Sequence, residues 1–497
     1  MLDKISPRLW AIAIMCAWGG AILWFGLVSF APYGLDEGAA MALLLNWSVV
    51  DQVVNPVTTY GGPDFRALLF IPLGLYWSGS MVAAKVFTLM VCFGATMLLY
   101  HWAKSRAESY ADEAALIATG LLLISPMLLQ QADSMGVGPY LIGAFGLGWI
   151  LDARYRASEH SISSLYFVQT LLVAISITLH PMGLAYPLAL AWHWHRNPKS
   201  GPNSQQQKKQ VWTGLAIASG IILAMQTGWI ALNWLENPFY SLSLALLGNT
   251  AGLIEEVSLV PGILAALLLI TVLAKQGRAL LDDLFGTSLL LALLIGLFVA
   301  DTNWALLALV VILYCGTPLL IRANLALGIH AGFIGQRGLV MAGLLVLATL
   351  FMQTDKAHGV RLESGLLPPT DELIQELVPE AADPERHFLA ASQWPARTML
   401  AVRADVLPLP PAADSASEQL AMIKGITHLI FNHNDPDNTQ LAKNFRELTD
   451  ATITLSRQPS GVILAVRDAP QQDPHAPQPA PAVSGDTPAV VSQPETP

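Results

Sequence analysis

Long apolar runs dominate this sequence and constrain its fold more than any other feature. Only 12% of the 497 residues are charged and 54% are hydrophobic, far more apolar than a soluble globular chain. The runs cover residues 9–31, 80–102, 112–130, 137–153, 163–180, 182–195, 211–234, 258–274, 284–300, 302–321 and 338–353. Since a spanning helix needs roughly 20 apolar residues, we expect a polytopic α-helical membrane protein with about eleven spans, some of them short, tilted or re-entrant.

Lysine and arginine residues alternate from loop to loop, which predicts the orientation of the spans. One set of loops carries Lys4 and Arg8, Lys104 and Arg106, Arg154 and Arg156, Arg196, Lys199, Lys208 and Lys209, Lys275 and Arg278, and Arg322 and Arg337. The intervening loops hold only Arg66. Positive loops stay in the cytoplasm, so we expect a bacterial-type inner membrane protein with a cytoplasmic N-terminus and a periplasmic or extracellular C-terminal region. The net charge of −10, concentrated in outer segments, argues against a nucleic acid partner.

The first outer loop, residues 32–79, carries two adjacent acids in the tetrapeptide Leu35-Asp36-Glu37-Gly38. Carboxylates beside a membrane span are costly to keep near hydrocarbon and therefore indicate a functional site. Residues 36–50 have apolar residues at helical spacing, which predicts a helix lying at the membrane interface. A second interpretation stays open, in which Asp36 only caps this helix and Glu37 only favours its positive end.

Other polar side chains expected on the outer side are candidates for binding a substrate: Tyr60, Arg66, Lys85, Asp133 and His180. Each has a simpler alternative. Lys85 can extend its ammonium to the membrane interface, and Arg66 can pair with a neighbouring acid or lie among lipid headgroups. His180, which precedes a proline, can be a satisfied polar residue at a break between helices.

The order of these features resembles the membrane glycosyltransferases of the C fold, nearest to the protein O-mannosyltransferase and aminoarabinose transferase group. Asp36 and Glu37 match the acidic motif in that family's first outer loop, and Lys85 matches its basic residue near the second span. The segments around Asp133 and His180 resemble later family segments, although no basic residue precedes Asp133. The resemblance covers about residues 1–200, and it implies that the acids are catalytic and that Lys85 contacts a lipid phosphate.

Transfer of a sugar from a polyprenyl phosphate needs a base for the acceptor proton and positive charge where the phosphate departs. Following the family positions, we assign Asp36 as the base and Glu37 as its electrostatic or metal-binding neighbour. A divalent cation, Mg or Mn, held by Asp36, Glu37 and Asp133 is an alternative without a ligand signature in the sequence.

These assignments predict an inner-membrane hexosyl- or pentosyltransferase that moves a sugar from a polyprenyl-phosphate donor to an acceptor on the periplasmic face. The acceptor class, a glycan, a lipid or a protein, stays open. The alternative function is a noncatalytic membrane subunit or scaffold, of the same fold, for an envelope glycan or protein assembly.

Composition changes abruptly after the last apolar run, which predicts a membrane domain over residues 1–354 and an exported α/β domain over residues 355–468. Loop 432–438 reads as a turn and helix cap, with contact to an acceptor or glycan as the alternative. The tail, residues 469–497, is rich in proline and alanine and should be disordered. The expected elements of the exported domain are helices at 370–377, 415–424 and 438–448, and strands at 387–391, 398–402, 427–431, 451–455 and 462–466.

Overall fold

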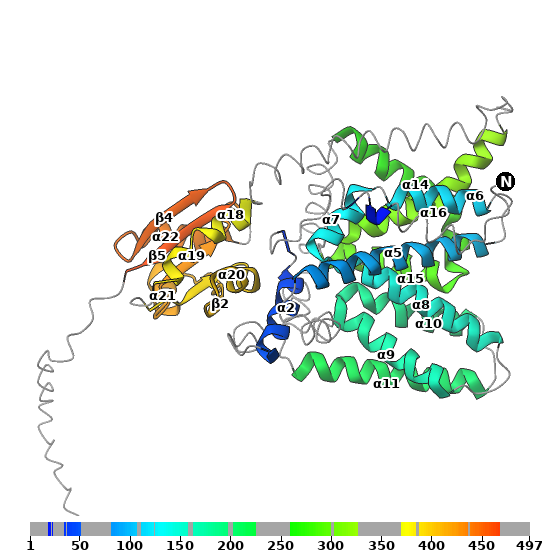
Figure 1. The fold of residues 1–497 in the computed structure, drawn as a ribbon, viewed down its shortest axis with the longest axis horizontal. Coiled ribbons are helices and arrows are strands. Elements are labelled where there is room, and N and C mark those ends of the chain that lie inside the picture. The colour runs from blue at the N-terminus through cyan, green and yellow to red at the C-terminus, as the bar shows by residue number, and fades with distance from the viewer. Residues whose placement is uncertain are drawn as a thin grey trace, which may run out of the picture.

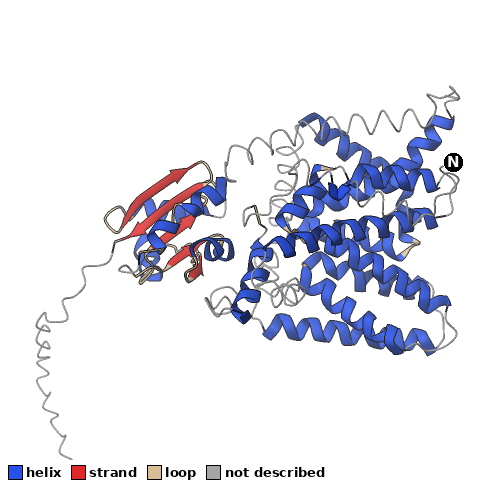
Figure 2. Cartoon of the chain, in the orientation of Figure 1, coloured by secondary structure: helices blue, strands red, loops and turns tan. Residues whose placement is uncertain are grey.

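Figures 1 and 2 show the fold in a computed structural model, in which the strands gather in the C-terminal part and helices make up the rest. The structure describes residues 18–20, 22, 34–35, 37–50, 81–106, 111–123, 125–157, 163–196, 202–224, 259–299, 303–326, 369–383, 387–435 and 438–467. The predicted span at 338–353, most of the span at 9–31, and the tail lie outside the described residues.

The N-terminal part is a helical bundle whose described elements follow the predicted apolar runs. Its helices are α5 (Met81–Ser105), α6 (Ala111–Leu123), α7 (Pro126–Ser134), α8 (Gly138–Ala157), α9 (Ser163–Leu179), the short 3-10 helix η2 (Pro181–Leu184), α10 (Ala185–Arg196), α11 (Pro202–Ala224), α14 (Leu259–Leu281), α15 (Leu284–Val299) and α16 (Asn303–Ala326). Large side chains such as Trp102, Phe145, Tyr186 and Phe285 are fully buried between them. Gly148 makes one close approach possible, because a Cβ there would lie only 2.2 Å from the Tyr186 ring.

Among the described residues, one helix is long and apolar enough to cross a bilayer alone, over Ala83–Ser105 of α5. The run at 112–130, expected as one span, forms two helices, α6 and α7, bent by 50°, which are long and apolar enough to cross a bilayer only when taken together. Pro126 begins α7, and the Ser125 side chain accepts a hydrogen bond from the Leu128 amide at 3.2 Å, so the break is capped. The apolar helices within α9, α15 and α16 are shorter, so the described residues do not establish eleven complete spans.

The C-terminal α/β unit, residues 369–467, is built on a five-stranded sheet with strand order β2-β1-β3-β5-β4. Strand β1 pairs in parallel with β2 and β3, whereas β5 pairs antiparallel with β3 and β4. The elements are α18 (Pro369–Gln375), α19 (Val378–Ala381), β1 (Ala390–Ser392), α20 (Pro395–Val402), β2 (Val406–Pro408), α21 (Ala416–Met422), β3 (His428–Phe431), α22 (Thr439–Glu447), β4 (Thr452–Gln458) and β5 (Gly461–Val466).

Alternating side chains give this sheet two apolar faces. Ala390, Ile430 and Ile463 belong to a buried cluster with residues of α18 and α20. The neighbouring positions Leu429, Phe431, Val462 and Leu464 belong to a second cluster with residues of α22. The unit therefore has helices on both sides of its sheet, with α18 and α20 on one face and α22 on the other.

Helix α2 (Glu37–Val50) lies between the bundle and the α/β unit (Figure 1). The sequence predicted this helix but placed it at the membrane interface. In the structure Ala39 to Leu44 are instead buried, in one cluster with Ala84 of α5 and Met399 of α20. Over these residues α2 is a buried connector and not a helix lying against lipid. Apolar side chains on all sides of this segment explain the difference, since such a helix is fully buried.

Candidate functional site

A buried ion pair connects the first turns of α5 to the end of α7. The Lys85 Nζ lies 3.0 Å from Asp133 Oδ1, and the two residues are 0% and 8% exposed. A lone ammonium or carboxylate would be costly there, so the pair stabilises each charge against desolvation. Asp133 is held one residue before the end of its helix, where Met135 takes a left-handed conformation with φ 56°. The structure thus brings together two of the residues that the sequence singled out, at opposite ends of one ion pair.

Glu37, at the start of α2, binds the N-terminus of α20 in the α/β unit. Its carboxylate accepts hydrogen bonds from the Ala396 amide at 2.5 Å and from the Arg397 amide at 3.3 Å. The residue preceding α20, Trp394, supplies no side-chain cap of its own. A carboxylate also suits the partial positive charge of a helix N-terminus. Glu37 therefore performs the capping role for a distant helix, whose Ala396 amide lies 359 residues later in the chain.

A second pair of charges, within the α/β unit, lies next to the Glu37 contact with α20. Arg397 Nη2 on α20 lies 2.8 Å from Asp371 Oδ1 on α18, and the Asp371 Oδ2 accepts a hydrogen bond from the Gly34 amide at 2.8 Å. Gly34 has φ 69°, a backbone conformation that glycine adopts readily and most other residues adopt only with strain.

Two groups of contacts lie beside one buried apolar cluster, and together we call them the junction network: the pair Asp133 and Lys85, and the group Asp371, Arg397 and Glu37. It links the acidic first loop, the start of α5, the end of α7 and the α/β unit. No sequence pattern pointed to Asp371 or Arg397, because charged residues in a polar region usually face solvent. Arg397 lies two positions after Pro395, and a proline at the first helical position is the one sign that α20 begins there.

His180 is not part of the junction network and lies at the break between α9 and η2. Its Nδ1 accepts a hydrogen bond from the Met182 amide at 3.2 Å, so the imidazole caps the short helix. Gly183 makes this break possible, because a Cβ there would lie 1.6 Å from the Ser176 carbonyl oxygen. The alternative interpretation of His180, a satisfied polar residue at a helix break, agrees with this geometry.

Asp36, Tyr60 and Arg66 lie outside the described residues, so their roles stay predictions. The described acids do not fit a divalent cation as they stand. Glu37 accepts two amide hydrogens and Asp133 binds an ammonium. Within the part of the chain that the structure describes, three or more potential metal ligands do not come together.

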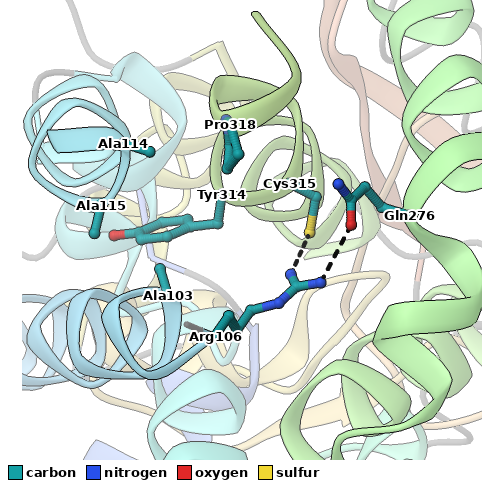
Figure 3. A pocket seen from close by; sticks show the side chains of 8 residues that line it. All are labelled: Ala103, Arg106, Ala114, Ala115, Gln276, Tyr314, Cys315 and Pro318. Carbon is teal, nitrogen blue, oxygen red and sulfur yellow. Dashed lines mark hydrogen bonds between the residues drawn. The ribbon is translucent and has the colours of Figure 1, made fainter. Parts of the chain in front are cut away.

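Figure 3 shows a different pocket, lined by Arg106 among others. Arg106 follows the C-terminal end of α5, whereas Lys85 lies near the N-terminal end of this helix. Arg106 points between α14 and α16, where its guanidinium donates to Cys315 Sγ and to Gln276 Oε1, both at 3.4 Å. The cavity measures only about 10 Å³. It has room for no more than a water, so it is a packing contact of the bundle and not a substrate site.

Comparisons with known proteins bear on the fold. No protein-family model matches the sequence, and the search of curated proteins gives no match. Among solved structures, the chain is similar to the archaeal oligosaccharyltransferase AglB from Archaeoglobus fulgidus, in complex with an inhibitory peptide and a dolichol-phosphate. That match has a TM-score of 0.50 and 12% identity, and it covers 94% of this chain and 75% of AglB.

ArnT from Cupriavidus metallidurans, in the apo state, aligns with a TM-score of 0.48 and 13% identity over 93% of this chain and 98% of ArnT. At these identities a likeness speaks for architecture alone, and the AglB match is the one that carries it. The resemblance expected from the sequence is thereby confirmed at the level of the fold. This chain has the fold of the membrane glycosyltransferases of the C type.

Proposed function

We propose that this protein is an integral inner-membrane glycosyltransferase that uses a polyprenyl-phosphate sugar and acts on the periplasmic side. The observation that carries the proposal is the buried Lys85–Asp133 pair at the start of the α5 span, beside the loop that holds Asp36 and Glu37. Ionisable residues buried in a membrane bundle mark substrate pathways by default. The AglB structure with its dolichol-phosphate supports the choice of a lipid-phosphate donor.

In the proposed reaction, Lys85 binds the phosphate of the donor. Asp36 takes the proton from the acceptor hydroxyl or amine as that atom forms its bond to the anomeric carbon of the sugar. The bond between the anomeric carbon and the phosphate oxygen breaks, and its electron pair leaves with the polyprenyl phosphate. The ammonium of Lys85 stabilises this developing charge in a site of low dielectric constant. The reaction balances without a redox partner.

The junction network suggests how Lys85 becomes available to a phosphate. Asp133 accepts a hydrogen bond from the Lys85 ammonium at 3.0 Å and thereby orients it. The phosphate of the lipid-linked sugar is a diester with one negative charge, so it competes with the Asp133 carboxylate for the Lys85 ammonium. It gains further negative charge as the sugar leaves, and this charge is what the ammonium stabilises. Glu37 then has a positioning role, because its two hydrogen bonds fix the end of the acidic loop against α20.

Mass spectrometry of lipids bound to the purified full-length protein tests the proposal. We expect a copurifying polyprenyl phosphate or its sugar conjugate with the wild-type protein, and its loss with Lys85→Met. Because that variant leaves Asp133 unpaired and buried, Lys85→Met combined with Asp133→Leu guards against a folding defect. Lys104→Met, at the far end of α5 and exposed, is the control that should retain the lipid. A wild-type protein without polyprenyl lipid, or a double variant that retains it, would contradict the proposal.

A further inference from the structure

A cavity of about 250 Å³ opens on the sheet face of the α/β unit that is opposite α18 and α20. Residues of β3, α22, β4 and β5 line it. Its floor is apolar, with Phe431, Phe445, Val462 and Leu464 among the lining residues, and its walls carry Thr449, Thr452, Thr454, His433, Arg446 and Arg457. Because the junction network is on the other face, this cavity is separate from the proposed transfer site.

A bulge in β4 places Arg457 in this cavity. Thr454 pairs with Leu464 and Arg457 pairs with Val462, while the register shifts between Thr454 and Ser456. In a regular strand, residues three positions apart point to opposite faces. Because Leu455 is an extra residue in β4, Thr454 and Arg457 point to the same face of the sheet, the face that lines the cavity. Bulges of this kind redirect side chains at sheet edges, often beside functional sites.

The charged side chains of the cavity all favour an anion. None of its described lining residues is acidic, whereas Arg446 approaches from α22 and Arg457 from β4. His433, from the loop after β3, is half-buried, and its Nδ1 is buried with no hydrogen-bond partner among the described residues. Burial, and then the positive charges of Arg457 and Arg446, lower the pKa of His433. Its neutral imidazole still has one N–H to donate.

We infer that this cavity binds an acidic sugar, with the carboxylate or phosphate of the ligand between Arg446 and Arg457. Guanidinium groups suit both anions through paired N–H donors. The threonine hydroxyls can bond to sugar hydroxyls, and the apolar floor offers a surface for the C–H face of a pyranose ring. The volume lies just below the range of roughly 300–1,000 Å³ for drug-sized ligands, which fits one monosaccharide unit. The chain would thus hold an acidic glycan away from its transfer site.

Equilibrium binding to the full-length protein in detergent tests this inference with defined probes. D-glucuronic acid represents the carboxylate source, glucose 6-phosphate the phosphate source, and D-glucose the neutral control. We expect at least one acidic sugar to bind about tenfold more tightly than glucose. The acidic sugar that binds more tightly shows whether the cavity prefers a carboxylate or a phosphate. Equal binding of all three sugars, or no binding of either acid, would overturn the inference.

Variants with matched changes in charge locate the binding. Arg446→Gln with Arg457→Gln should weaken the acidic probe about tenfold or more. Lys424→Gln with Lys443→Gln removes the same charge from exposed positions outside the cavity and should leave binding unchanged. Hydrogen exchange with the bound probe should protect residues 445–457, and both variants should match the wild type in β5. Equal loss in both variants, or protection confined to the Lys85 region, would contradict this site without affecting the proposed transferase.

Discussion

At the scale of single residues, Glu37 shows how one carboxylate can serve two parts of the chain. The sequence offered two roles, a catalytic neighbour of Asp36 or a charge at the end of its own helix. The structure adds a third, because the carboxylate caps α20 in a distant unit. A helix cap typically contributes about 0.5–2 kcal/mol. The acidic loop is therefore held in place by the α/β unit.

Replacing Glu37 should release the first turn of α20. In Glu37→Ala we expect faster hydrogen exchange at the amides of Ala396 and Arg397, because both lose their acceptor. Glu37→Gln keeps one acceptor oxygen and should fall between the alanine variant and the wild type. Hydrogen exchange with mass spectrometry on peptides spanning residues 394–400 measures this directly. Glu372→Ala, an exposed acid on α18, is the control that should change nothing there. Unchanged exchange in Glu37→Ala would remove the capping role.

His433 should make the α/β unit sensitive to acid. Its pKa in the folded state is lowered below the ordinary 6.5 by burial and by Arg457 and Arg446. The unfolded state therefore binds its proton more readily, so His433 favours folding above its ordinary pKa and this contribution is lost as the pH falls below it.

Local hydrogen exchange in β4 and α22, measured from about pH 5 to about pH 8 with correction for intrinsic rates, tests this dependence. The wild type should lose protection toward acid more steeply than His433→Gln. Parallel curves for the two proteins would show that His433 does not control the effect.

At the scale of elements, the break between α9 and η2 depends on one glycine. Gly183→Ala would place a Cβ 1.6 Å from the Ser176 carbonyl, a backbone atom that cannot move without shifting α9. We expect a loss of several degrees in the thermal midpoint, or poor folding, measured in detergent. Gly143→Ala in α8 meets open space and should be neutral or slightly stabilising, by up to about 1 kcal/mol. Equal midpoints for both variants would contradict the close packing at the break.

Most elements of the α/β unit were predicted from the sequence, but the prediction was wrong for α20, the helix that contacts Glu37. Residues 398–402 have apolar and β-branched side chains that suggested a strand, yet they form the second half of α20. A short apolar run does not distinguish strand from buried helix, and Pro395 was the better guide. The strand at 406–408 was missed because its three residues, Val-Leu-Pro, are too few to show alternation.

In the bundle, apolar runs located the described helices well. They could not reveal the capped bend at Ser125, because hydropathy does not distinguish one long helix from two short ones. In the site, the sequence identified Lys85 and Asp133 separately. Their pairing could not be deduced, since it depends on how α7 turns back against α5.

At the scale of the whole molecule, the junction network couples the α/β unit to the loop with the acidic motif. Arg397→Met should leave Asp371 buried without its cation, which typically costs about 3–5 kcal/mol for a buried pair. We expect faster hydrogen exchange in both α2 and α18. Adding Asp371→Asn should recover part of the protection, because the unpaired charge is removed. Arg467→Met, exposed at the end of β5, should have no such effect. A loss of hydrogen-exchange protection confined to α20 would argue against coupling between the α/β unit and the acidic loop.

In the proposed function, the acidic motif takes part in the transfer of a sugar from a polyprenyl phosphate. The most direct measurement compares cells that carry wild-type protein, Asp36→Asn or a deletion, at equal levels of the two expressed proteins, by mass spectrometry of lipids and envelope glycans. Loss of the base should reduce transfer by about a hundredfold or more. We predict that Asp36→Asn cells accumulate a polyprenyl-phosphate sugar and lose the same glycan modification as the deletion. Wild-type lipid and glycan profiles in the Asp36→Asn cells would contradict the account and favour a noncatalytic subunit.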